Sequence, residues 1–498
     1  MPSPSYAGVV LDVEPAKKGP SAKLEPDTPF HILILGDFSG RASRGVVEPI
    51  LGRRPMQVDR DEIENLPKIL NTEIRVPLAG DHGAELRIPV ATLDDLHPDY
   101  LYESCALFPA MKAMRRRLEN PASLKAATDE ILGGLVREAP KEARATSDII
   151  TGSILDQIAE GADDPAPAKG ARPRDPLLAY VQDLVAPHLV PGQDPKQKEL
   201  LAQLDAETGA QMRALLHQPV FQGVEASWRA LDYLVRHVET DTQLKIYLLD
   251  VSKSELLADL AAASDLKQTG LYQLLVRATP QGEPWSLIGC DCTFRPWVDD
   301  IELLARISMV VDMAGAPIIA GADPSILGVK NPEHLADNDE WEVDNPLWDE
   351  IRQFPEARRV GLAMPRFLIR SPYGKNSSPL ERFQFEEMPE GSTHAHYLWA
   401  NSMYLCVMLI AQAFSHAKWD LRVGQFQSVR SLPTHTWTEY GNPELKPCAE
   451  VLFTLKAAET MIGQGLMPVL SMKGSDEVRV GMFQSIAKPQ SPLEGRWR

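Results

Sequence analysis

A chain of 498 residues is too long for one ordinary hydrophobic core, so we expect two or three domains. Its net charge of -18 repels phosphate backbones, which argues against nucleic acid as a general partner. The hydrophobic fraction of 44 % is ordinary for a globular protein, and no apolar run approaches the roughly 20 residues of a bilayer span, so we expect no membrane insertion.

The first residues and the cysteines predict a cytoplasmic protein. The N-terminal sequence lacks the basic and apolar regions of a signal peptide. Five cysteines in so long a chain form no disulfide framework, which agrees with a reducing compartment.

The first part of the chain predicts strands followed by helix. An apolar run from Pro29 to Gly36, PFHILILG, is typical of a buried strand, and Gly36–Arg41 forms the turn after it. Thr92 is expected to begin a helix, with Asp95 placed as in a capping box. Further elements of this part are two strands and a charged helical region, at 75–78, 85–90 and 109–138.

The middle of the chain predicts a short amphipathic helix and a linker. The helix is expected at 147–160, because four apolar residues fall on one face: Ile150, Ile154, Leu155 and Ile158. Residues 161–176, GADDPAPAKGARPRDP, are too rich in proline, glycine and charge to bury much apolar surface. The helix either packs on its own domain or is displayed on this tether as a recognition helix.

Beyond the linker, helices and strands alternate. Residues 200–235 are mostly helical, with a break expected at Pro219. Basic Arg366 and Arg370 alternate with apolar residues, which predicts a half-buried strand with basic groups on one side. Further predicted elements are strands at 245–251, 285–294 and 317–320 and a helix at 301–314. The fold class is therefore α/β, or mixed α+β.

The residues that invite an enzyme interpretation lack the necessary context. His394 and His396 have no second ligand pair at zinc-site spacing, and Cys290 and Cys292 read as small apolar residues on one face of a strand. The glycine-containing loops lack nucleotide-binding spacing, at 36–40 and 321–330. We therefore expect no catalytic, cofactor-binding or metal-binding residues; an enzyme with a cryptic metal site is the least favoured alternative.

Two sets of motifs resemble the contractile sheath proteins of type VI secretion. The first 140 residues resemble the small subunit (TssB or VipA), through PFHILILGDFSGR at Pro29–Arg41 and matches at 55–61 and 93–98. The later part resembles the large subunit (TssC or VipB), through motifs at 217–235, 251–256, 359–374, 383–387, 397–401 and 432–436.

The resemblance implies a phage-tail-sheath-like fold with two sheath-type domains, at 1–140 and 206–498, joined through residues 141–205. It implies no catalysis and no cofactor. The implied partners are other sheath subunits or further copies of the chain, an inner tube protein, a baseplate and a ClpV-type AAA+ ATPase that recycles the contracted sheath.

Two interaction sites follow from the same resemblance. Residues Val9, Val10, Leu11 and Val13 resemble the strand that links neighbouring protomers, which is a form of β-augmentation. Residues 147–161 resemble the helix that the ATPase grips.

Two departures from the family pattern keep two functions open. Both subunit types are present in one chain, and the sequence ends soon after 483–489, before the closing strands expected of a large subunit. The chain is therefore either a fused sheath subunit that contributes to injection, or a non-polymerising accessory that caps, terminates or regulates a sheath.

Overall fold

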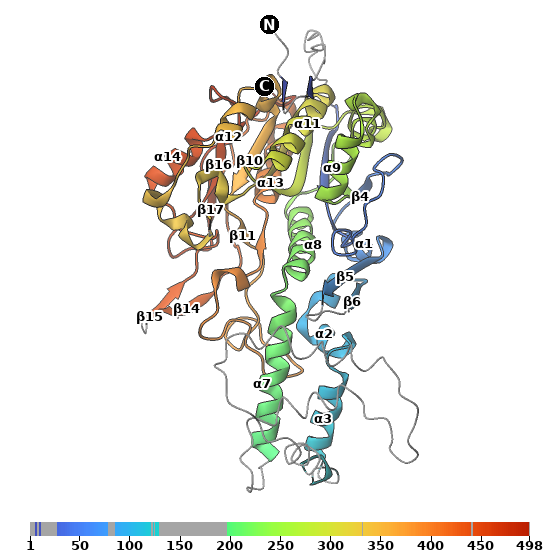
Figure 1. Cartoon of the computed structure of the whole chain (residues 1–498), viewed down its shortest axis with the longest axis vertical. Helices are drawn as coiled ribbons and strands as arrows, with labels where there is room; N and C mark the ends of the chain where they lie inside the picture. Colours follow the sequence, from blue (N-terminus) through green and yellow to red (C-terminus); the bar gives the residue numbers. More distant parts are fainter. Residues whose placement is uncertain are drawn as a thin grey trace.

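The computed structural model describes residues 27–77, 85–120, 197–330, 332–439 and 442–497, together with 5–6, 9–10, 123 and 125–128. Figure 1 shows a large sheet flanked by helices, from which two long helices extend side by side toward the opposite end. Within the described part of the chain, no helix combines the length and apolar character that a membrane span requires.

A nine-stranded mixed sheet forms the centre of the fold, in the order β13-β17-β16-β10-β9-β8-β3-β7-β4. The six strands from β16 to β7 are parallel, whereas β13, β17 and β4 run antiparallel to their neighbours. The strands in chain order are β3 (Phe30–Gly36), β4 (Met56–Val58), β7 (Leu244–Asp250), β8 (Leu287–Phe294), β9 (Ile318–Ala322), β10 (Val360–Met364), β13 (Ser428–Val429), β16 (Leu466–Ser471) and β17 (Val478–Val480).

Strand β3 comes from the first part of the chain but lies between two strands of the later part. Its seven residues pair with β7 from Phe30–Leu244 to Gly36–Asp250, and Ile32–Leu35 pair with β8 on the other side. All seven residues are buried. The first part of the chain therefore supplies an interior strand of the sheet.

The two faces of β3 contribute to two hydrophobic cores. Ile32 and Ile34 join the core beneath α8 (Pro219–His237) and α13 (Met403–Ala417). Leu33 and Leu35 join the core beneath α9 (Lys253–Ala262) and α11 (Val298–Ala314). This alternation is the period of two expected of a strand covered on both faces.

The two long helices at the far end join the same two parts of the chain. Helix α3 (Pro109–Glu119) packs on α7 (Gln197–Leu216), and the Gln197 amide donates to the Leu118 carbonyl at 2.6 Å. Helix α7 ends at Leu216 and α8 begins at Pro219, so the break expected at that proline is confirmed.

Smaller elements complete the described structure. The short helices are α1 (Leu66–Ile69), α2 (Pro98–Ser104), α10 (Gly270–Tyr272), α12 (Pro346–Ile351) and α14 (Leu455–Gly463). The two-stranded sheets are β1 (Ser5–Tyr6) with β2 (Val9–Val10), β5 (Thr72–Pro77) with β6 (Glu85–Val90), β11 (Phe367–Leu368) with β12 (Trp399–Ala400), and β14 (Thr436–Glu439) with β15 (Asn442–Leu445).

The mixed α/β class is confirmed, and some local expectations are corrected. The capping box of Thr92 and Asp95 is present, but it begins a 3-10 helix at Leu93–Leu96. The predicted strand around Arg366 shrinks to the two residues Phe367–Leu368. The predicted helix at 147–160, the linker at 161–176, Leu11 and Val13 lie outside the described residues.

His31 on β3 makes the central strand sensitive to acid. Its side chain is fully buried beside Tyr247 and Trp285, and neither ring nitrogen has a hydrogen-bond partner among the described residues. Burial, with a smaller contribution from the Lys245 charge, lowers the pKa of His31 from 6.5 to about 4. The folded state therefore holds His31 neutral where the unfolded chain binds a proton.

We predict that stability falls as the pH drops from 6.5 toward 4, by up to about 3 kcal/mol from His31 alone. Above pH 6.5 this contribution is fully present. The substitution His31→Leu should remove it, so that urea midpoints measured at pH 7 and pH 4.5 differ less than in the unchanged chain. An equal pH dependence in both proteins would show that His31 is not the responsible group.

Candidate functional site

The site lies at the carboxyl edge of the parallel strands, where the strand order reverses. Among the parallel strands, β3 is followed in chain order by β7 on one side and then by β8 on the other. In open α/β sheets, ligands bind outside the carboxyl ends of strands at such a reversal. The turn Gly36–Arg41 occupies this position and is therefore the candidate functional site.

Two carboxylates hold the turn in shape. Asp250, at the end of β7, accepts hydrogen bonds from the Phe38 and Ser39 amides at 2.9 Å and from the Ser39 hydroxyl at 2.7 Å. Asp37 accepts from the amides of Arg41 and Ala42 at 2.6 and 2.7 Å. The turn is therefore built on one acid from each part of the chain.

Gly40 is required where the turn meets β5. Its φ is +75°, and a Cβ atom there would lie 2.5 Å from the Glu73 carbonyl oxygen. Only glycine combines this backbone conformation with so close an approach.

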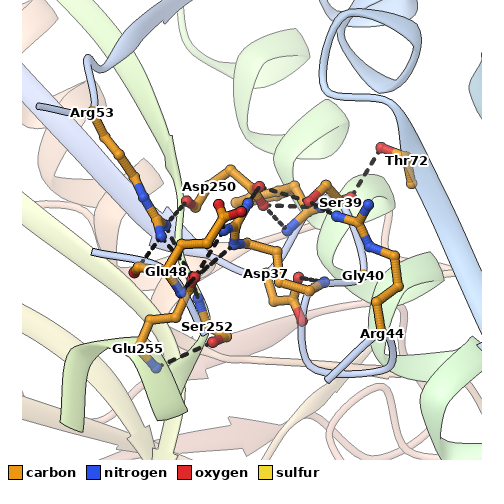
Figure 2. A network of polar contacts seen from close by, with 12 residues as sticks. Asp37, Ser39, Gly40, Arg44, Glu48, Arg53, Thr72, Asp250, Ser252 and Glu255 are labelled. Carbon is orange, nitrogen blue, oxygen red and sulfur yellow. Dashed lines mark hydrogen bonds and ion pairs between the residues drawn. The ribbon is translucent and has the colours of Figure 1, made fainter. Parts of the chain in front are cut away.

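Glu255 is the centre of the charged network in Figure 2. The Arg41 Nε donates to both of its oxygens at 2.9 Å, and the two Nη atoms of Arg53 donate to it at 3.0 and 2.6 Å. The Ser252 amide also donates to Glu255, which completes a capping box at the start of α9. The Glu255 side chain is fully buried, so its charge is balanced almost entirely by the two arginines.

The electrostatics keep this pairing charged. Burial raises the pKa of Glu255, but hydrogen bonds from Arg53 and Arg41 outweigh it and lower the pKa to about 2. Burial raises the pKa of nearby Asp37 above its ordinary value. Carboxylates already occupy the guanidinium groups of Arg41 and Arg53, and a phosphate would have to displace them. The arrangement joins two parts of the chain through buried ion pairs.

A second charged cluster lies where α8 meets the loop after β11. Arg370 donates to Glu225 at 2.8 Å and to Glu387 at 2.7 and 2.9 Å, and its guanidinium carbon lies 4.4 Å from the centre of the Tyr373 ring. Burial raises the pKa of Glu225, but the charges of Arg370 and Arg229 lower it below its ordinary value. Arg370 is therefore an internal ion-pair residue, which corrects the expectation of a strand with basic groups on its open side.

The first part of the chain also contacts this second cluster. The His97 ring meets the Tyr373 ring edge-on at 4.9 Å. Asp99 accepts hydrogen bonds from the amides of Glu381 and Arg382 at 3.0 and 3.1 Å. These contacts join the two parts of the chain at a place separate from the turn.

The two histidines that invited a metal interpretation, His394 and His396, contact other side chains. His394 Nε2 lies 3.0 Å from Glu450, which also pairs with Arg366, whereas His396 stacks on His217 with ring centres 4.3 Å apart. Within the described residues, no group of three or more histidine, cysteine or acidic side chains could hold a metal ion.

The prediction that Cys290 and Cys292 are small apolar residues on one face of a strand is confirmed. Cys290 and Cys292 are both buried in the core beneath α9 and α11, on the same face of β8. Each cysteine thus acts as a small apolar residue of that core.

Sequence reasoning identified the turn but missed its partners. Asp250 and Glu255 follow the turn by more than 200 residues, and that distance hides the pairing. One local signal was available, since Ser252-Lys-Ser-Glu255 has the Ser-x-x-Glu spacing of a capping box. It predicts a helix start but does not reveal the arginines.

We predict that Glu255→Gln lowers the free energy of unfolding by about 3 kcal/mol, because it removes the buried counter-charge that Arg41 and Arg53 share. The matched control is Glu48→Gln. Glu48 also pairs with Arg41 but is 64 % exposed, so its loss should cost no more than about 1 kcal/mol. Urea unfolding at pH 7 measures both. Equal losses would mean that the buried pairing does not stabilise this edge.

Comparison with known proteins agrees with the structure. The family model described as VipB (EvpB/VC_A0108, tail sheath N-terminal domain) matches residues 198–487, more than half of the chain. The model described as VipA of the type VI secretion system (VC_A0107 or Hcp2) matches residues 9–143.

A curated relative supports the larger match. The type VI secretion system sheath protein TssC1 of Pseudomonas aeruginosa is 32 % identical over 306 residues, which are 59 % of this chain and 61 % of the relative. Both expected resemblances are confirmed, as is the expectation that the chain is not an enzyme, since these are structural sheath proteins. The chain therefore belongs to the VipB tail sheath family of type VI secretion, and its first part carries a VipA-type sequence.

Proposed function

We propose that this chain is a fused sheath subunit, which assembles by strand exchange around an inner tube and drives injection when the sheath contracts. The observation that carries the proposal is the position of β3. A strand from the part that matches VipA fills an interior place in a sheet whose remaining long strands come from the part that matches VipB.

The stability that β3 contributes supports a protein in which the two matched parts stay together. Removing the strand would break backbone ladders on both sides and expose four core side chains at 32–35. Each such side chain contributes about 2 kcal/mol through burial alone. A contracting sheath transmits force through its protomers, and a joint of this kind resists separation under load.

The charged contacts support the same view. The turn at 37–41 binds Asp250 and Glu255, and Asp99 binds the loop at 381–382. Helix α3 also packs on α7. The two parts of the chain therefore meet at three places: the edge of the sheet, the loop at 381–382, and the pair of helices α3 and α7.

We predict that the purified full-length chain, without any other sheath protein, forms tubules in negative-stain electron microscopy. A matched sample contains the chain beside a complete pair of separate sheath subunits. Particles that never form tubules and bind only the ends of sheaths built by the separate subunits would overturn the proposal. They would establish the accessory function that caps or terminates a sheath.

The two interaction sites expected from the resemblance belong to this proposal. Val9, Val10, Leu11 and Val13 would link neighbouring protomers; the described backbone shows Val9–Val10 as strand β2, paired with β1. The apolar face at 147–160 would be gripped by a ClpV-type ATPase in a helix-in-groove mode. A baseplate and an inner tube protein complete the proposed set of partners.

We predict that Ile154→Asp combined with Ile158→Asp abolishes binding to such an ATPase, because two charges cannot enter an apolar groove. The control combines Ser153→Asp with Gln157→Asp, which adds the same charge to the neighbouring face of the predicted helix. Pull-down of the ATPase with each variant measures the effect. Loss of binding in both pairs, or in neither, would contradict recognition through the apolar face.

A further inference from the structure

The hairpin of β14 and β15 stands out from the body of the protein (Figure 1). Its strands pair only with each other in the described part of the chain, from Thr436–Leu445 to Glu439–Asn442. A lone two-stranded ribbon is at best marginally stable in water, and its outer edges offer unpaired backbone groups. The hairpin therefore needs support from the body of the protein, and its edges are open to pairing with another strand.

The base of the hairpin is firmly held. The Lys446 ammonium lies 5.3, 6.0 and 5.7 Å from the ring centres of Tyr397, Trp399 and Trp437. The Tyr397 hydroxyl is 2.9 Å from His435 Nδ1, and the Ser371 hydroxyl donates to the Thr434 carbonyl at 2.8 Å. The arm is therefore preorganised, which lowers the entropy cost of any pairing along its edge.

The ladder geometry shows which backbone groups point outward. The Lys446 amide donates to the His435 carbonyl at 2.8 Å, so these two residues form a hydrogen-bonded pair. Because such pairs alternate in an antiparallel ladder, the pair Trp437–Glu444 is also hydrogen-bonded. The amides and carbonyls of Thr436 and Thr438 on β14 then face away from β15.

The two outer edges are not equivalent. On β15 the outward positions are Pro443 and Leu445, and proline has no N–H to donate. Proline on an outer edge is a common protection against unwanted pairing. The β14 edge has no such protection, since both Thr436 and Thr438 present a donor and an acceptor.

We propose that the β14 edge pairs in antiparallel fashion with β14 of a second copy of this chain, giving a four-stranded sheet β15-β14-β14-β15. In the register centred on Trp437, Thr436 of one copy meets Thr438 of the other, and both threonines supply outward-facing hydrogen-bonding groups. Trp437 meets its counterpart in a non-hydrogen-bonded pair, the type in which side chains are closest.

The chemistry of β14 favours this occupant. Trp437 is 39 % exposed, and an aromatic pair across two strands stabilises their contact. A finite, two-fold contact results, because the same surface is used by both copies.

The test is disulfide trapping with Trp437→Cys. A non-hydrogen-bonded antiparallel pair brings Cα atoms to about 4.5 Å, within disulfide range. The control is Glu444→Cys, at the position directly across the same hairpin, with the buried native cysteines present in both variants. Under mild oxidation and on non-reducing gels, Trp437→Cys should give at least about tenfold more covalent dimer than the control. Equal amounts, or no dimer, would overturn the proposal.

A second experiment tests the same pairing without an introduced cysteine, by comparing two proline substitutions. Thr436→Pro and Leu445→Pro change residues that face each other in the ladder, and each removes one outward N–H without breaking a bond inside the hairpin. In sedimentation equilibrium, Thr436→Pro should weaken dimerisation by at least about tenfold, equivalent to about 1.4 kcal/mol, while Leu445→Pro leaves it unchanged. Equal effects would overturn pairing through β14.

These measurements use the free chain, diluted below any concentration at which tubules form. Pairing of two free chains through β14 does not depend on sheath assembly. Tubules without dimer trapping would remove only the hairpin proposal, and dimer trapping without tubules would remove only the proposed function.

Discussion

The structure depends on the backbone ladder that β3 forms on both of its sides. A strand at a sheet edge can be displaced by a competing strand, but an interior strand leaves only if two ladders and two cores open together. Because β3 precedes its neighbours by more than 200 residues, this arrangement fixes the rest of the fold. It joins both cores, places the turn after β3 at the reversal of strand order, and brings both matched parts into one sheet.

The turn at the reversal of strand order places buried ion pairs at a position that binds ligands in other proteins. In many sheets of this topology the same edge is open and binds phosphates or cofactors. Here Arg41 and Arg53 converge on the buried Glu255, so the edge carries its own counter-charges. A buried ion pair gives modest net stability but strongly penalises the loss of one partner, which suits a joint that must form in one register only.

Sequence reasoning recovers the features that depend on local chemistry. The apolar run of β3, the break at Pro219 and the capping box at Thr92 all follow from short patterns. The insertion of β3 between β7 and β8 could not be predicted. A strand that is buried on both faces is apolar throughout, and its sequence does not specify which strands pair with it. Arg370 was misplaced for a related reason: alternation with apolar residues suggests an open side, whereas Glu225 and Glu387 meet it from elsewhere in the chain.

Carrying both matched parts in one polypeptide changes how the joint forms. Between separate chains, insertion of β3 is an association that depends on the concentration of both. Within one chain it becomes an intramolecular step with an effective concentration set by the connecting segment, and the ratio of the two parts is always one to one. The same connection makes β3 pairing highly non-local, so loop-closure entropy must be overcome before the two ladders stabilise the sheet. Fusion therefore secures stoichiometry, while the specificity of the joint still rests on the ladders and on the buried pairing of Glu255.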